Sequence, residues 1–212
     1  MIAFKVYSQR KNEVTLMKIS EYIKSSIDAT DRKELEQALM FVCQAIDGTA
    51  KKTYPNTLVG DRFCKFINDN LEIIELMVGG LNLQETNFPF PNKKDGVGIS
   101  FAEIVYEKFR CYLSHGEELP EGYGVSIQII EGCQQFFIDL QKNAMTLPQS
   151  VIYALGLVCV LAPVNIDQKI GSYQYWYRDP INSYVIDRWW GKVDCAREIM
   201  DFDGQVRVKM DF

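Results

Sequence analysis

The stretch "VIYALGLVCVLAPV", residues 151–164, is the most apolar run in the chain and limits the folds available to it. At about 1.5 Å of rise per residue, a helix over this run is too short to cross the roughly 30 Å hydrocarbon layer of a membrane before Pro163 interrupts it. A helix that is apolar on all sides must then be covered by other parts of the protein. The run therefore predicts a buried helix, and we expect no membrane partner.

Four segments before this run carry apolar residues at spacings of three and four, the pattern of an amphipathic helix. Asp31 with Glu34, and Ser100 with Glu103, match the capping box that opens a helix. Gly116 suits the left-handed residue that ends one. We predict helices over about 13–27, from Asp31 to the break at 51–57, over 60–78, and from Ser100 to Gly116, with a long loop over 81–98.

The pattern changes after residue 120. Residues 125–140 are rich in β-formers around a Glu-Gly pair and predict a β-hairpin. Residues 171–184 predict an aromatic loop, residues 187–200 a helix, and residues 203–212 a terminal strand. The chain is thus predicted to be mainly α, a helical bundle core with a small β element in its C-terminal half.

No internal repeat or linker divides the sequence. We predict a single domain over 1–212, with a helical core over about 13–116 and the hairpin, apolar helix and final helix and strand over about 120–212.

Composition limits the ligands. The 23 Lys and Arg against 28 Asp and Glu give a net charge of -5, so the surface lacks the positive field of a general nucleic-acid binder. We expect no DNA partner, and RNA would need a local basic site. Six scattered cysteines and one histidine do not form a metal-ligand pattern, and no cofactor-binding motif is present. We predict a cytoplasmic protein with reduced thiols, without metal or cofactor.

The segment "FRCYLSHGEELP", residues 109–120, holds the one histidine of the chain, His115, five positions after Arg110. On a helix this spacing separates the two side chains by about 140°, so it allows a joint site without requiring one. A structural explanation is also open. Arginine near the C-terminal end of a helix is favoured by the helix dipole, and histidine before a capping glycine can bind the free carbonyls.

The stretch "RCYLSH" resembles the signature of HEPN domains, in which a histidine follows an arginine by a few residues. The neighbouring stretches "AIDGTAKKTYP", "VGDRFCKFI" and "YEKFRCYLSHGEELP" are similar to bacterial proteins with a HEPN-like helical core, so the resemblance covers roughly residues 30–120.

The resemblance implies a metal-independent endoribonuclease of toxin or defence type, a homodimer with RNA as substrate. His115 would be the acid or base and Arg110 the phosphate clamp. Active HEPN members carry Asn, Asp or His after the arginine, where this chain has Cys111. The alternative is a non-catalytic helical module for protein interaction or dimerisation.

Three charged residues flank the apolar faces of the second and third predicted helices, namely Asp47, Asp61 and Arg62. The expected arrangement is a buried Asp-Arg bridge between these two helices. A pair of metal-binding carboxylates is the alternative, although the sequence fixes no ligand geometry.

Aromatic and basic residues alternate near the C-terminus. Arg178, Trp189 and Lys192 are candidates for an RNA or phosphate site, because aromatic rings stack on bases and cations hold phosphates. The alternative is that the cluster packs the edge of the core or a subunit contact. We expect Trp189, Trp190 and Gly191 to be the most buried part of it.

Overall fold

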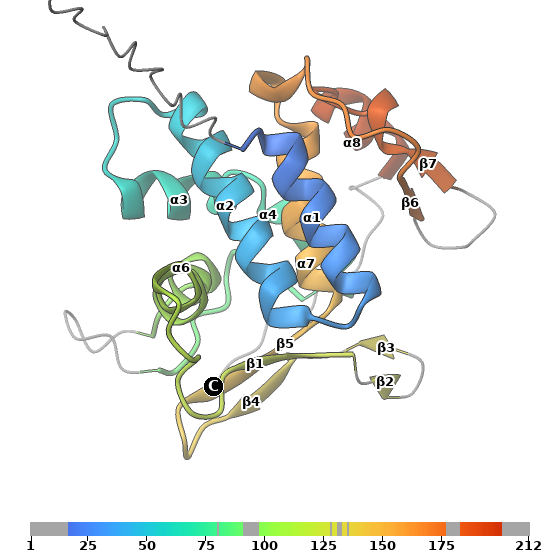
Figure 1. Ribbon diagram of the computed structural model, residues 1–212. Helices are drawn as coiled ribbons and strands as arrows, with labels where there is room; N and C mark the ends of the chain where they lie inside the picture. Colours follow the sequence, from blue (N-terminus) through green and yellow to red (C-terminus); the bar gives the residue numbers. More distant parts are fainter. Residues whose placement is uncertain are drawn as a thin grey trace, which may run out of the picture.

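The computed structural model describes residues 17–79, 81–90, 98–127, 129–130, 133–134, 136–176 and 183–200. Within these residues the chain is mainly α-helical, with small β elements in its C-terminal half, as the sequence predicts (Figure 1). None of the described helices is both long and apolar enough to cross a membrane.

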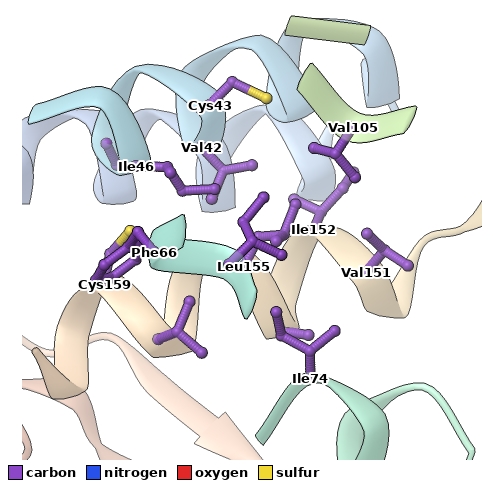
Figure 2. Close-up of a cluster of buried hydrophobic side chains, with 14 of the residues drawn as sticks. Val42, Cys43, Ile46, Phe66, Ile74, Val105, Val151, Ile152, Leu155 and Cys159 are labelled. Carbon is purple, nitrogen blue, oxygen red and sulfur yellow. The ribbon is translucent and has the colours of Figure 1, made fainter. Parts of the chain in front are cut away.

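The predicted buried helix is confirmed as α7 (Ser150–Leu161), nine of whose twelve residues are buried. It packs against α1 (Ile19–Asp31), α2 (Leu35–Thr53) and α4 (Leu71–Met77). Figure 2 shows side chains of α7, such as Leu155, meeting Val42 and Ile46 of α2. The apolar run therefore forms the centre of the core.

The turn between α1 and α2 corrects the capping box predicted at Asp31. Asp31 is the last residue of α1, and α2 begins four residues later without a side-chain cap. Lys33 adopts a left-handed φ of 64°, and the N–H of Glu34 donates to the carbonyl of Ala29 at 2.9 Å. These features form a C-terminal stop, so the segment ends α1 rather than opening α2.

The single helix predicted over 60–78 is two helices, α3 (Val59–Asn68) and α4. Asn70 lies between them in a non-helical conformation, and its side-chain amide donates to the carbonyl of Phe66 at 2.8 Å. Asparagine side chains compete with the helix in this way for backbone groups.

The helix predicted from Ser100 to Gly116 is confirmed, with an unexpected middle. It comprises α5 (Phe101–Ile104), the π-helix η1 (Val105–Arg110) and α6 (Cys111–His115). The Ser100–Glu103 capping box opens it, as predicted. Gly116 ends it with φ 69° and ψ 25°, also as predicted.

The β elements differ from the predicted hairpin over 125–140. Among the residues described there, only the short pair of β2 (Ile129–Ile130) and β3 (Cys133–Gln134) is a hairpin. β1 (Gly124–Ser126) pairs in parallel and β4 (Phe137–Asp139) antiparallel with β5 (Ala144–Pro148), giving the order β1-β5-β4.

The prediction missed β5 because this strand does not alternate. Four of its five residues are buried, so it lacks the period of two that marks a half-exposed strand. The residues before Ser150 therefore give no local signal for a strand.

The C-terminal part also departs from prediction. The aromatic loop contains an antiparallel pair, β6 (Gln174–Trp176) and β7 (Ser183–Val185). The helix predicted over 187–200 is a 3-10 turn, η3 (Ile186–Arg188), followed by α8 (Val193–Met200). The terminal strand predicted over 203–212, and residues 13–16 of the first predicted helix, lie outside the described residues.

Candidate functional site

Arg110 lies at the junction of η1 and α6, where its side chain faces α2. Its Nη2 lies 2.8 Å and its Nε 2.9 Å from the same carboxylate oxygen, Oδ2 of Asp47. The side chains of Arg110 and Asp47 are only 18% and 15% exposed. The arginine proposed as a phosphate clamp is therefore already engaged by a carboxylate.

The π-helix directly precedes this contact. Its hydrogen bonds join residues five apart rather than four, so one residue is added to the turn and the following side chains are rotated by roughly 100°. Val105 and Phe109 of η1 remain fully buried. Such π segments are frequent at functional sites and need a local explanation. Here the segment ends at Arg110, the residue that binds α2.

Tyr106 supports the arginine from the same helix. Its ring lies 5.5 Å from the Arg110 guanidinium and 5.3 Å from the ring of Phe63 on α3. A cation over an aromatic face is attracted by the ring quadrupole. The guanidinium is thus held by a carboxylate from α2 and a ring from η1.

The electrostatic balance at Asp47 is unfavourable to its charge. Burial raises the pKa of Asp47, and the nearby charges of Arg110 and Arg62 oppose this without cancelling it. Burial lowers the pKa of Arg110, but the charge and hydrogen bonding of Asp47 outweigh it and leave the pKa raised. Removing the carboxylate from water therefore costs more than its cationic neighbours return.

His115 lies elsewhere. It is the last residue of α6 and is exposed, just before the helix ends in the hydrogen bond from Glu117 N to Tyr112 O at 3.0 Å. Among the described residues, no hydrogen bond or ion pair joins the side chains of His115 and Arg110. The structure therefore does not bring the two predicted site residues into direct contact.

A second polar contact fixes the same helix to α2. Gln44 Nε2 donates to Ser114 Oγ at 3.0 Å, one turn from the contact between Asp47 and Arg110. We call η1 and α6 together the motif helix, because they carry Arg110 and His115. The two contacts hold this helix to α2 on both sides of Cys111.

The predicted Asp-Arg bridge between the second and third helices needs correction. Asp47 is bridged to Arg110 of η1, whereas Arg62 of α3 donates to the backbone carbonyl of Thr57 at 3.3 Å. The sequence indicates both Asp47 and Arg110 but not their pairing, because nothing local to either residue indicates which distant helix it faces. In the described part of the chain, no group of three acidic, cysteine or histidine side chains is placed to hold a metal ion.

Among the described residues, the aromatic C-terminal candidates differ in accessibility. Trp190 is 2% exposed, as expected, and its Nε1 donates to Asp187 Oδ1 at 3.3 Å. Trp189 is partly buried against the core, while Lys192 is exposed. This arrangement favours packing over base stacking for Trp189. Arg178 lies outside the described residues.

Comparison with known proteins places the chain beside mycobacterial relatives. A family model described as Rv1289 matches residues 18–212. The proteins named Rv1289 from Mycobacterium tuberculosis and Mb1320 from Mycobacterium bovis are each 30% identical over 203 residues, which covers 92% of this chain and 93% of each relative. No solved structure matches the chain significantly.

Proposed function

This chain belongs to the Rv1289 family, and from that premise we propose that it is a non-catalytic helical module that acts by self-association. The match runs over residues 18–212, so the unit shared by the family includes the helices and the β elements together. A function that uses the whole unit accounts for this extent better than one confined to the six residues of the Arg-His motif.

The engagement of Arg110 is the observation that carries the proposal. A phosphate clamp must present its guanidinium to the substrate. Arg110 instead directs two N–H groups at Asp47 and lies against Tyr106. Its geometry supports a structural role, which is to fix the motif helix to α2.

Apolar side chains on one part of the surface support the self-association. Met17 is 41%, Val164 40% and Ile166 60% exposed. Their two segments meet where Ser20 N donates to Gln168 Oε1 at 3.1 Å. Covering such a group removes apolar area from water, which is the main driving force of protein association.

Sedimentation equilibrium tests this proposal. We expect the wild type to form a dimer and Ile166→Asp to shift it to the monomer, because the new carboxylate would be buried in the interface. Leu140→Asp is the matched control, since Leu140 is 51% exposed but lies in the turn between β4 and β5. A wild type that stays monomeric at high concentration would contradict the proposal, as would equal effects of the two variants.

A HEPN-like ribonuclease is the second candidate, favoured by the exposure of His115 at the end of the helix that carries Arg110. An exposed imidazole can exchange protons with an RNA 2′-hydroxyl or leaving oxygen. The test is cleavage of a mixed RNA pool in EDTA by the wild type, His115→Ala and Arg110→Ala, each of verified fold. Cleavage that leaves cyclic-phosphate ends and is lost in both variants would favour the ribonuclease; no cleavage at high protein concentration would favour the module.

A further inference from the structure

The turn η2 (Pro163–Asn165), which follows α7, reverses the usual polarity of a surface turn. Asn165 is 1% exposed, whereas its neighbours Val164 and Ile166 are 40% and 60% exposed. Asparagine is ordinarily exposed in proteins, while valine and isoleucine are among the residues most often buried. A turn that only connected two elements would place the amide in water and the apolar side chains inside. The reversal therefore favours an interaction surface over a simple connection.

The buried amide holds the turn in this orientation. Nδ2 of Asn165 donates to Thr49 Oγ1 and to the backbone carbonyl of Cys159, both at 2.9 Å. Its Oδ1 accepts a hydrogen bond from Lys52 Nζ at 3.2 Å. A buried polar group whose hydrogen bonds are satisfied makes the structure around it more rigid. The side chain of Asn165 thus fixes the direction in which Val164 and Ile166 point.

The backbone at Ile166 is also constrained, by Gly191. A Cβ on Gly191 would lie 2.7 Å from the Cβ of Ile166, so the approach of the two segments requires glycine. The N–H of Gly191 donates to the carbonyl of Val160 at 2.9 Å, which joins this segment to α7. Because the turn is already fixed, little conformational freedom is lost when a partner covers it.

Both signs of charge border the exposed apolar side chains. Lys18 follows Met17 and Asp167 follows Ile166, and both charged residues are exposed. Within the described part of the chain, neither charge takes part in an ion pair. A partner of one sign, such as a nucleic acid or an acidic peptide, would repel one of the two charges. A second copy of this chain carries the same two charges and can pair with both.

We propose that the occupant of this surface is a second copy of the chain, in an isologous contact where Asp167 of each copy pairs with Lys18 of the other. Val164 and Ile166 of the two copies pack together at its centre. Two-fold symmetry makes each charge pair occur twice. This inference rests on the self-association proposed above and specifies its surface and its charge pairing. The apolar centre supplies affinity, and the charges set the register.

Charge reversal tests the pairing. Asp167→Lys and Lys18→Asp each turn two attractions of the dimer into repulsions, so either variant alone should dimerise on the order of tenfold more weakly than the wild type. In the mixed dimer of the two variants, lysine again faces aspartate at both positions. We expect this mixed dimer, and the homodimer of the double variant, to recover the wild-type dissociation constant. Sedimentation equilibrium with one variant fluorescently labelled measures these constants.

The two reversals are compatible with the fold. Lys18 is the N-cap residue of α1, where aspartate is favoured, and Asp167 is exposed. Thermal unfolding verifies that the variants are folded.

Glu121→Lys is the matched control, because it makes the same change of charge as Asp167→Lys at an exposed residue before β1. β1 pairs with β5 at the start of α7, whereas η2 follows the end of α7. The twelve residues of α7 separate these two ends by about 18 Å. The control should leave the dissociation constant unchanged. Equal weakening by Glu121→Lys would overturn the contact, since net charge rather than position would then be the cause.

The remaining outcomes separate this contact from self-association in general. Single reversals that weaken the dimer without recovery in the mixture would overturn the pairing, because the two charges then do not face each other. A dimer that Ile166→Asp dissociates and that neither reversal weakens would overturn the charge pairing while leaving self-association intact. A wild type that stays monomeric at high concentration would overturn both.

Discussion

Asp47 and Arg110 lie 63 positions apart and meet only because α2 and η1 pack together. At the scale of the residue, this contact decides how the Arg-His motif is interpreted. Arginine is the preferred cation for bidentate recognition of phosphate, but it is equally suited to a carboxylate inside the protein. Here the carboxylate is present at 2.8 Å, so the same side chain stabilises the fold.

The pH dependence of stability tests the electrostatics of Asp47. Because burial raises the pKa of Asp47 above its ordinary value of 3.8, the folded chain holds this proton more tightly than the unfolded chain does. The stabilising effect of the group is thus complete below that value and is lost as the pH rises through the folded-state pKa. We expect the stability of the wild type relative to Asp47→Asn to fall as the pH rises above 3.8 in urea unfolding series.

Asp69 provides a control of opposite sign. Burial raises its pKa, but the hydrogen bonds from Tyr54 and Lys65 outweigh burial and leave the pKa lowered. Its contribution to stability is therefore present above the ordinary value and is lost as the pH falls. A difference between wild type and Asp47→Asn that changes with pH in the same direction as that of Asp69→Asn would contradict the assignment.

Thiol reactivity tests the burial of single cysteines. Burial raises the pKa of Cys159 to about 12 and raises that of the fully buried Cys43 as well, whereas Cys195 on α8 is exposed. Since the thiolate is the reactive form, iodoacetamide at about pH 8 should label Cys195 at least tenfold faster than Cys43 or Cys159. Peptide mapping measures the three rates. Equal rates before denaturant is added would show that the predicted core is open.

The sequence indicates the chemistry of the candidate site more readily than its pairing. Arg110, His115, Asp47 and Trp190 all stand out by residue type and by position near helix ends or apolar faces. Their partners do not, because a contact such as that of Gln44 with Ser114 depends on how distant helices pack. Local periodicity carries no information about that packing.

Helix ends show, at the scale of the element, where local sequence is sufficient. Gly116 adopts φ 69°, a conformation that glycine reaches without the steric penalty of a side chain. The Ser100–Glu103 capping box works at the other end of the same helix. Both ends are fixed by interactions within a few residues, and both were predicted.

Two glycine substitutions test this explanation. A Cβ at Gly116 or at Gly124 would meet no atom within 4 Å, so neither substitution causes a clash. Only Gly116 has a left-handed φ. We expect Gly116→Ala to lower the free energy of unfolding by about 1 kcal/mol, and Gly124→Ala to leave it unchanged within about 0.5 kcal/mol. Equal losses in chemical denaturation would mean that backbone conformation is not the cause.

Elements that depend on tertiary contacts were predicted less well. The sequence does not predict β5, because this strand is buried between its partners and shows no alternation, and it predicts a loop where β6 and β7 pair. The break between α3 and α4 depends on one side-chain hydrogen bond from Asn70. The π-helix η1 gave no recognisable signal, because its apolar residues also fit an ordinary helical spacing.

At the scale of the whole molecule, α7 organises the chain. Its side chains contact α2 and α4, as Figure 2 shows, and the strand β5 leads directly into it. The sheet of β1, β5 and β4 lies at one end of the helices in Figure 1. The prediction of a mainly α protein with a minor β part followed from one apolar run and four amphipathic segments, and it is confirmed.

The motif helix is attached to this core through α2, so the role of Arg110 can be measured as stability of the entire chain. A double-mutant cycle of Asp47→Ala and Arg110→Ala, followed by urea unfolding at about pH 7, isolates the energy of their interaction. Because the pair is largely buried, we expect a coupling of about 1–3 kcal/mol, against less than about 1 kcal/mol for the exposed pair of Lys65 and Asp69. A coupling no larger than that of the exposed pair would show that Arg110 is not held by Asp47, and would contradict its structural role.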